Sequence, residues 1–78
     1  MEIAIDVTSP VHPYVQIANQ LRAAIASGEI TGLLPSLTQI SAETGVALNT
    51  VQRAFRLLKD EGLVHTVPGR GTFVTGKQ

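Results

Sequence analysis

The hydrophobic pattern of the chain changes its period at Gly62. Before this residue, apolar side chains recur at helical spacing, as Tyr14, Ile17 and Leu21 do. After it, residues 63–67 alternate between the two sides of an extended chain and are rich in β-branched residues, which is typical of a half-buried strand. Helices followed by strands within one short chain predict an α+β fold.

Three helices are expected before this change, and local stop and start signals define them. Proline suits the first position of a helix, serine followed three residues later by glutamine has capping-box spacing, and glycine ends helices. Asn49 is a competent N-cap for the third helix, whereas Ala47 is not. The expected helices run from Pro13 to Ser27, from the Ser36 cap to a stop at Gly45, and from Leu48 or Asn49 to about Glu61.

Dense turn chemistry then divides the C-terminal part into two strands. Residues 68–71, Pro-Gly-Arg-Gly, lie between residues 63–67 and the second β-rich segment, 72–75. This composition predicts a hairpin with a single cation, Arg70, at its tip. A further, very short strand is expected at residues 33–34.

A chain of 78 residues forms one domain. Weak alternation near the start predicts that residues 1–12 are an N-terminal arm or a short strand. The folded domain is expected to comprise residues 13–75, with residues 76–78 as a tail.

Composition excludes several classes of site. Cysteine is absent, which removes disulfides, thiolate catalysis and cysteine-based zinc sites. His12 and His65 are too few and too far apart to indicate a metal site. No apolar run approaches the roughly 20 residues that span a bilayer, and no catalytic triad or carboxylate pair is evident. We therefore expect no enzyme activity, no cofactor, no metal and no membrane contact, and a cytoplasmic location.

Charge is balanced overall but unevenly distributed. The net charge of zero, taken alone, disfavours a nucleic-acid-binding protein. All but one of the 6 Lys and Arg residues nevertheless lie at position 53 or later, whereas most of the 6 acidic residues precede it. Such asymmetry is typical of a surface that faces a polyanion, and scatter over a small surface is the alternative.

The second and third expected helices are joined by the tight turn at residues 44–47, as in a helix-turn-helix. In that motif the first helix braces across the DNA backbone and the second presents its first turns to the major groove. Asparagine, glutamine and arginine are the side chains best matched to base edges. The candidates here are Leu48, Asn49, Thr50, Gln52 and Arg53, with Arg56 placed to reach phosphate and Arg70 placed to enter a minor groove.

From Tyr14 to Val74 the sequence resembles the winged helix-turn-helix domain of the GntR family of bacterial transcription regulators. The motifs that carry the resemblance occur in order along most of the chain. Residues 49–54, followed by an aromatic residue, resemble the branch of the family with short C-terminal regions. The matching segments are Leu34-Pro35-Ser36, Gly45-Val46, Thr50-Val51, Glu61-Gly62-Leu63-Val64 and Gly69-Arg70-Gly71-Thr72-Phe73-Val74.

The resemblance implies sequence-specific binding of double-stranded DNA by a transcriptional regulator, with repression favoured, in the bacterial cytoplasm at the nucleoid. It implies three helices and a β-hairpin wing, the third helix in the major groove and the wing in the minor groove. A homodimer on a palindromic site is an expected assembly, and the family's effector domain is not in this chain. The complete set of expected DNA contacts is Ser36, Thr38, Leu48, Asn49, Thr50, Gln52, Arg53, Arg56, Gly69, Arg70, Gly71 and Thr72.

Three departures from the family pattern keep other functions open. Thr38, the pair Ala47-Leu48, and Gln52 replace the residues usual in the family, each replacement removing an arginine. A winged helix used for protein–protein contact is one alternative, which zero net charge and Leu48 support. A DNA-bending architectural or excision factor is another.

Overall fold

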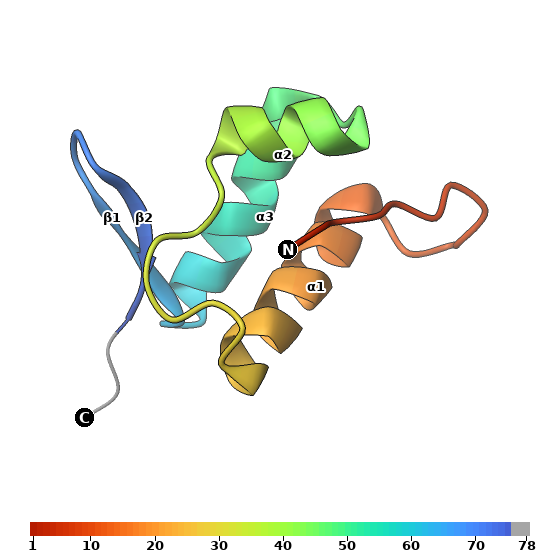
Figure 1. Cartoon of the computed structure of the whole chain (residues 1–78). Helices are drawn as coiled ribbons and strands as arrows, with labels where there is room; N and C mark the ends of the chain where they lie inside the picture. The colour runs from red at the N-terminus through yellow and green to blue at the C-terminus, as the bar shows by residue number, and fades with distance from the viewer. Residues whose placement is uncertain (76–78) are drawn as a thin grey trace.

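The computed structural model describes residues 1–75. Three helices are followed by two antiparallel strands, so the expected α+β order is confirmed (Figure 1). The elements are α1 (Pro13–Ser27), α2 (Leu37–Thr44), α3 (Leu48–Asp60), β1 (Val64–Val67) and β2 (Gly71–Val74).

Helix α3 is the central element, and α1, α2 and β1 all pack against it (Figure 1). Val51, Ala54, Phe55 and Leu58 recur at helical spacing and are buried, as the sequence pattern predicts. Burial of each large apolar side chain contributes about 1.5–3 kcal/mol. The buried core comprises Ile3, Ile17, Ala18, Leu21, Leu34, Ile40, Val51, Ala54, Phe55, Leu58 and Val64.

Helix α2 begins and ends at the residues that local chemistry predicts. The Ser36 hydroxyl accepts a hydrogen bond from the Gln39 N–H at 3.0 Å, which is the serine half of a capping box. Gly45 adopts a φ of 74° after the last turn, and its N–H donates to the Ser41 carbonyl. This left-handed conformation is one that glycine adopts without steric cost.

The expected N-cap of α3 was wrong. Ala47, not Asn49, caps this helix, and it makes no side-chain hydrogen bond. The helix starts earlier because the N–H groups of Thr50 and Val51 both donate to the Ala47 carbonyl. Packing of Val46 against the core fixes the turn and overrides the local preference of asparagine for the cap.

A distant segment pairs with the hairpin through a single bridge. Strands β1 and β2 pair from Val64 opposite Val74 to Val67 opposite Gly71, within one residue of the expected limits. Leu33 forms an isolated bridge with Phe73, so the short strand expected at residues 33–34 is supported. Strand β2 therefore lies between β1 and this segment.

Residues 1–12 lie along α1 as an arm and form no strand. The Gln20 amide accepts from the Ala4 N–H at 3.1 Å and donates to the Ala4 carbonyl at 2.6 Å. One helical turn earlier, the Gln16 amide makes the same pair of bonds with Asp6, at 2.9 and 3.0 Å. The arm also inserts Ile3 into the core.

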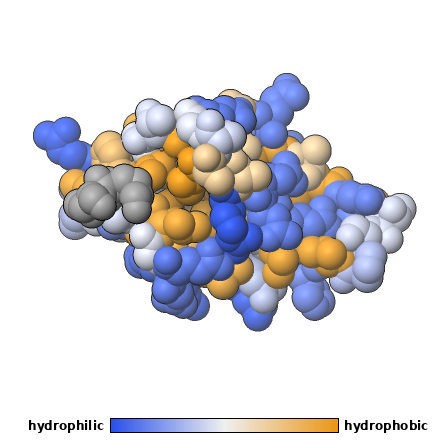
Figure 2. Space-filling model, turned by 90° about the horizontal axis from the view of Figure 1, so that it is seen from below, coloured by the Kyte–Doolittle hydropathy of each residue, from blue (hydrophilic) through white to orange (hydrophobic). Residues whose placement is uncertain are grey.

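An ion pair joins α1 to the residue that follows α3. Arg22 donates to both carboxylate oxygens of Glu61, from Nε at 2.9 Å and from Nη2 at 2.7 Å. These hydrogen bonds, together with the positive charge, hold the pKa of Glu61 below its ordinary value. Figure 2, which views the molecule from below, shows hydrophilic side chains across the middle of this face between hydrophobic areas.

Candidate nucleic-acid interface

The residues expected to contact DNA lie on three elements, and these elements approach one another at one end of the molecule. Helix α2, the first turn of α3 and the tip of the hairpin all lie toward the top of Figure 1. Ser36 and Thr38 occupy the start of α2, and residues 48–52 form the first turns of α3. Residues 69–72 form the tip of the hairpin and the beginning of β2.

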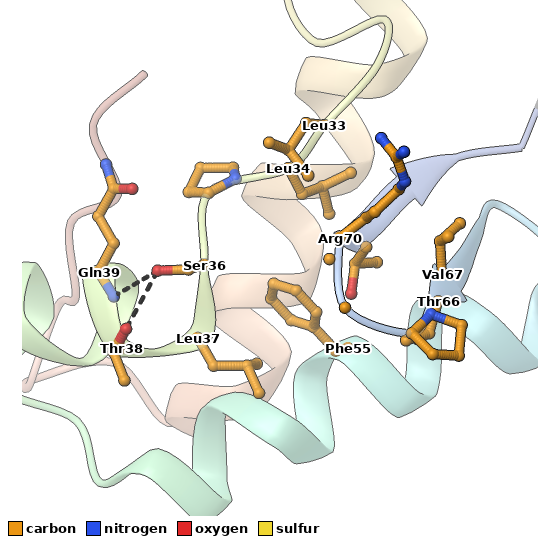
Figure 3. Close-up of a pocket in the computed structure, with 15 residues that line it drawn as sticks. Leu33, Leu34, Ser36, Leu37, Thr38, Gln39, Phe55, Thr66, Val67 and Arg70 are labelled. Atoms are coloured by element: carbon orange, nitrogen blue, oxygen red, sulfur yellow. Dashed lines mark hydrogen bonds between the residues drawn. The ribbon is translucent and has the colours of Figure 1, made fainter.

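A groove of about 610 Å³ separates the start of α2 from the hairpin. Its lining is largely apolar and includes Leu33, Leu37 and Phe55, together with hairpin residues 66–72 (Figure 3). Leu33 is 58% exposed here although it is a large apolar residue. Although the groove lies between α2 and the hairpin, the segment that leads into α2 is hydrogen-bonded to the hairpin.

That lead-in segment couples the hairpin to α2. The Leu34 N–H donates to the Thr72 carbonyl at 2.8 Å, and the Val74 N–H donates to the Gly32 carbonyl at 2.9 Å. Pro35 and the Ser36 cap follow at once. The wing and the start of α2 are therefore held in a fixed relation by a few residues of chain.

The tip of the hairpin is slim because glycine stands on both sides of Arg70. Gly69 and Gly71 have φ values of 77° and 128°, conformations that L-residues rarely adopt. A Cβ on Gly71 would also lie 2.9 Å from Cδ1 of Leu33. Arg70 is exposed, makes no ion pair within residues 1–75, and extends its guanidinium away from Phe55 (Figure 3).

The start of α3 presents free polar groups. Asn49 and Gln52 are exposed, and their side chains form no hydrogen bond with the part of the chain that the structure describes. Leu48, beside them, is 42% exposed. Because no side chain caps α3, the N–H groups of Leu48 and Asn49 are also available to an acceptor. Thr50 is half-buried.

Arg53 and Arg56 lie on a different flank of α3 from the groove. The guanidinium carbon of Arg53 is 4.1 Å from the centre of the Tyr14 ring. The two arginines line a hollow of about 200 Å³ together with Tyr14, Leu57 and Asp60. The apolar pattern of α1 favours Tyr14 as a core residue over a stacking platform. Tyr14 is half-buried, and the sequence does not predict its contact with Arg53.

Two kinds of site are absent from residues 1–75. No group of three or more His, Cys, Asp or Glu side chains there is arranged to hold a metal ion. No helix in this range has the length and apolar character needed to cross a membrane.

Comparison with known families decides the class of protein. Residues 13–74 match the model of bacterial regulatory proteins of the gntR family. The chain belongs to the gntR family. This family consists of regulatory proteins, and membership of it supports the expectation that the chain is not an enzyme. The matched range covers nearly the whole domain expected at residues 13–75.

Curated relatives of the family are also regulators. The uncharacterised HTH-type transcriptional regulator RB1450 of Rhizobium meliloti is 45% identical over 64 residues, which cover 80% of this chain and 26% of that protein. The HTH-type transcriptional repressor NagR of Bacillus subtilis is 39% identical over 69 residues, covering 86% of this chain and 28% of NagR. The chain thus spans little more than a quarter of the length of these relatives.

Solved structures of gntR-family proteins share the fold. YtrA from Sulfolobus acidocaldarius, a GntR-family transcription factor, superposes with a TM-score of 0.88 at 35% identity, covering 100% of this chain and 84% of YtrA. The DNA-binding domain of AraR in complex with operator ORX1 gives a TM-score of 0.82 at 25% identity, covering 95% of this chain and 96% of that domain. The winged helix-turn-helix prediction is confirmed.

Proposed function

We propose that this gntR-family domain binds double-stranded DNA sequence-specifically and acts in transcriptional regulation, with repression as its favoured role. The first turns of α3 enter the major groove, and the hairpin tip enters the adjacent minor groove. α2 braces on the phosphate backbone. NagR is a transcriptional repressor and the AraR domain was solved on an operator, which supports the proposal by kinship.

The observation that carries the proposal is the convergence of three exposed elements at one end of the molecule. The major groove admits a helix, and asparagine and glutamine amides match the donor and acceptor pattern of adenine. The narrow minor groove concentrates negative potential and accepts arginine from a slim loop. Asn49, Gln52 and Arg70 supply these side chains without a competing bond within residues 1–75.

A net charge of zero does not oppose this proposal, because unpaired positive charges are concentrated on the elements expected to meet DNA. Arg53, Arg56 and Arg70 all lie on α3 or on the hairpin, and none of the three forms an ion pair with a described residue. Arg22, by contrast, is neutralised by Glu61. The cations left unpaired are those on the elements expected to meet DNA.

Selection of bound sequences from a random pool of DNA duplexes tests the proposal. The selected duplex is then titrated by fluorescence anisotropy against wild type, Gln52→Ala and Arg70→Ala. Loss of a base-reading contact lowers affinity by about 1–3 kcal/mol and relaxes preference at one position. Glu29→Gln is the control, because Glu29 is exposed in the segment that follows α1. The C-terminal end of α1 lies at the opposite end of the molecule from the hairpin tip (Figure 1).

Two outcomes contradict the proposal in different ways. Absence of binding to any duplex at low salt indicates a winged helix used for protein contact, for which the exposed Leu33 and Leu48 are the candidate surface. Equal affinity for selected and random duplexes, with bending of both, indicates an architectural factor. A selected sequence with one half-site or two also establishes the number of chains bound.

A further inference from the structure

The contact between Tyr14 and Arg53 assigns a role to a residue outside the three expected DNA-binding elements. Tyr14 lies in the first turn of α1, and Arg53 lies in the second turn of α3. The guanidinium carbon is 4.1 Å from the ring centre, well within the range of a cation–π interaction. The His12 ring also stacks on Tyr14, with centroids 6.3 Å apart.

This contact places Arg53 away from the wing. Arg53 and Phe55 are two residues apart on α3, which separates them by about 160° around the helix axis. Phe55 lines the groove beside the hairpin, whereas Arg53 lines the hollow beside α1. A helix in the major groove is flanked by two phosphate backbones, and the two flanks of α3 face different ones.

The cation–π contact with Tyr14 does not occupy the N–H donors of Arg53 with an acceptor oxygen. The guanidinium carbon lies over the Tyr14 ring, and the five N–H donors of the group form no hydrogen bond within residues 1–75. A carboxylate partner would instead occupy those donors, as Glu61 occupies those of Arg22. Arg53 forms no hydrogen bond or ion pair within residues 1–75, although Asp60 lines the same hollow.

We propose that Tyr14 is a positioning residue that holds Arg53 for a DNA phosphate on the α1 side of the recognition helix. This inference rests on the proposed function. Tyr14 restricts a flexible side chain before binding, which lowers the cost of ordering it in the complex. The free guanidinium edge then donates two parallel hydrogen bonds to one phosphate, the geometry that arginine prefers. Arg56, one turn further along the same hollow, adds a second cation.

A phosphate contact has a signature that differs from base reading. Arg53→Gln is expected to weaken binding to selected and random duplexes by the same factor, because phosphate carries no sequence information. It is also expected to reduce the slope of log affinity against log salt by about 0.9. Arg53 is exposed, so this variant keeps the core intact.

A double-mutant cycle tests the positioning role. Tyr14→Leu, Arg53→Gln and the double variant are titrated with the selected duplex, and urea unfolding is recorded for each. Tyr14→Leu is expected to lower affinity about two- to five-fold with Arg53 present, the size of an exposed cation–π interaction, and to have little effect in the Arg53→Gln background. Tyr14→Phe retains the ring and is expected to retain the coupling to Arg53.

The inference is overturned if Tyr14→Leu lowers affinity equally in both backgrounds, which is the behaviour of a purely structural residue. An unchanged salt slope in Arg53→Gln overturns it as well, even if Tyr14→Leu does not fold. Failure of the wild-type chain to bind any duplex refutes the proposed function itself, and this inference with it.

Discussion

Gly71 is the position where a single methyl group tests the geometry of the wing. Its φ of 128° lies outside the regions that L-residues populate. An added Cβ would lie 2.9 Å from Cδ1 of Leu33, closer than van der Waals contact allows. Gly71→Ala therefore has two separable costs, one in the backbone and one against a neighbouring side chain.

The backbone cost is the larger of the two. Holding a non-glycine residue at such a φ costs on the order of 1–3 kcal/mol. The contact with Leu33 is relieved by rotation, because this side chain is 58% exposed and its Cδ1 is a terminal atom. We expect Gly71→Ala to lower the free energy of unfolding by about 1–3 kcal/mol, and the further change Leu33→Ala to restore little of it.

Urea unfolding followed by circular dichroism measures this loss, and Gly32→Ala is the matched control. Gly32 lacks a positive φ, and a Cβ added to it would have no neighbouring atom within 4 Å. Amide exchange at Leu34 gives a local measurement, because its N–H donates to the Thr72 carbonyl beside the substitution. Faster exchange at Leu34 in Gly71→Ala, with unchanged exchange in Gly32→Ala, is expected.

Equal stability of the two glycine variants would refute the reasoning, since it would mean that the backbone at Gly71 relaxes without cost. Full recovery of stability on adding Leu33→Ala would refute the ranking of the two costs, since it would assign the loss to the side-chain contact.

Three further predictions concern the stability of the fold. Removing the hydroxyl in Ser36→Ala is expected to cost about 1 kcal/mol, visible as a lower urea midpoint, because α2 loses its N-cap bond; an unchanged midpoint contradicts the assigned cap. The pKa of Glu61 is lower in the folded state than its ordinary value of 4.5, so the ionised carboxylate stabilises the fold above pH 4.5. This stabilisation is lost as the pH falls through the lowered pKa. Wild type is therefore expected to lose more stability than Glu61→Gln between pH 7 and pH 3 in urea titrations, and parallel losses contradict an effect of the Arg22 ion pair. Gln20→Leu is expected to increase proteolysis of the arm, because both hydrogen bonds between the Gln20 side chain and Ala4 disappear, whereas unchanged cleavage means that these two bonds do not hold the arm.

The sequence predicts the elements of this fold where local chemistry decides them. Pro13 and Gly28 bound the first helix, and Ser36 and Gly45 bound the second, as the structure confirms. Each of these residues acts through its own backbone or through a bond three residues away. Such effects are independent of the rest of the molecule, so the pattern suffices to predict them.

The sequence does not predict features that packing between distant segments determines. Asn49 has the better capping side chain, yet the start of α3 is set by the packed turn before it, and Ala47 takes the cap. The partnership of Tyr14 with Arg53 joins two helices, and no periodicity within either helix indicates it. The expected DNA contacts themselves stay predictions, to be tested by the titrations above.

The paired bonds of Gln16 and Gln20 to the arm reflect a coincidence of two repeat lengths. Four residues of α-helix advance about 6 Å, and two residues of extended chain advance about 6.6 Å. Amides one turn apart on α1 therefore meet alternate residues of the arm, Ala4 and Asp6. Inserting one residue between Ala4 and Asp6 would leave only one of the two glutamine side chains able to form its pair of hydrogen bonds with the arm. A polar helix face can thus set the register of an extended segment, much as a neighbouring strand does in a sheet.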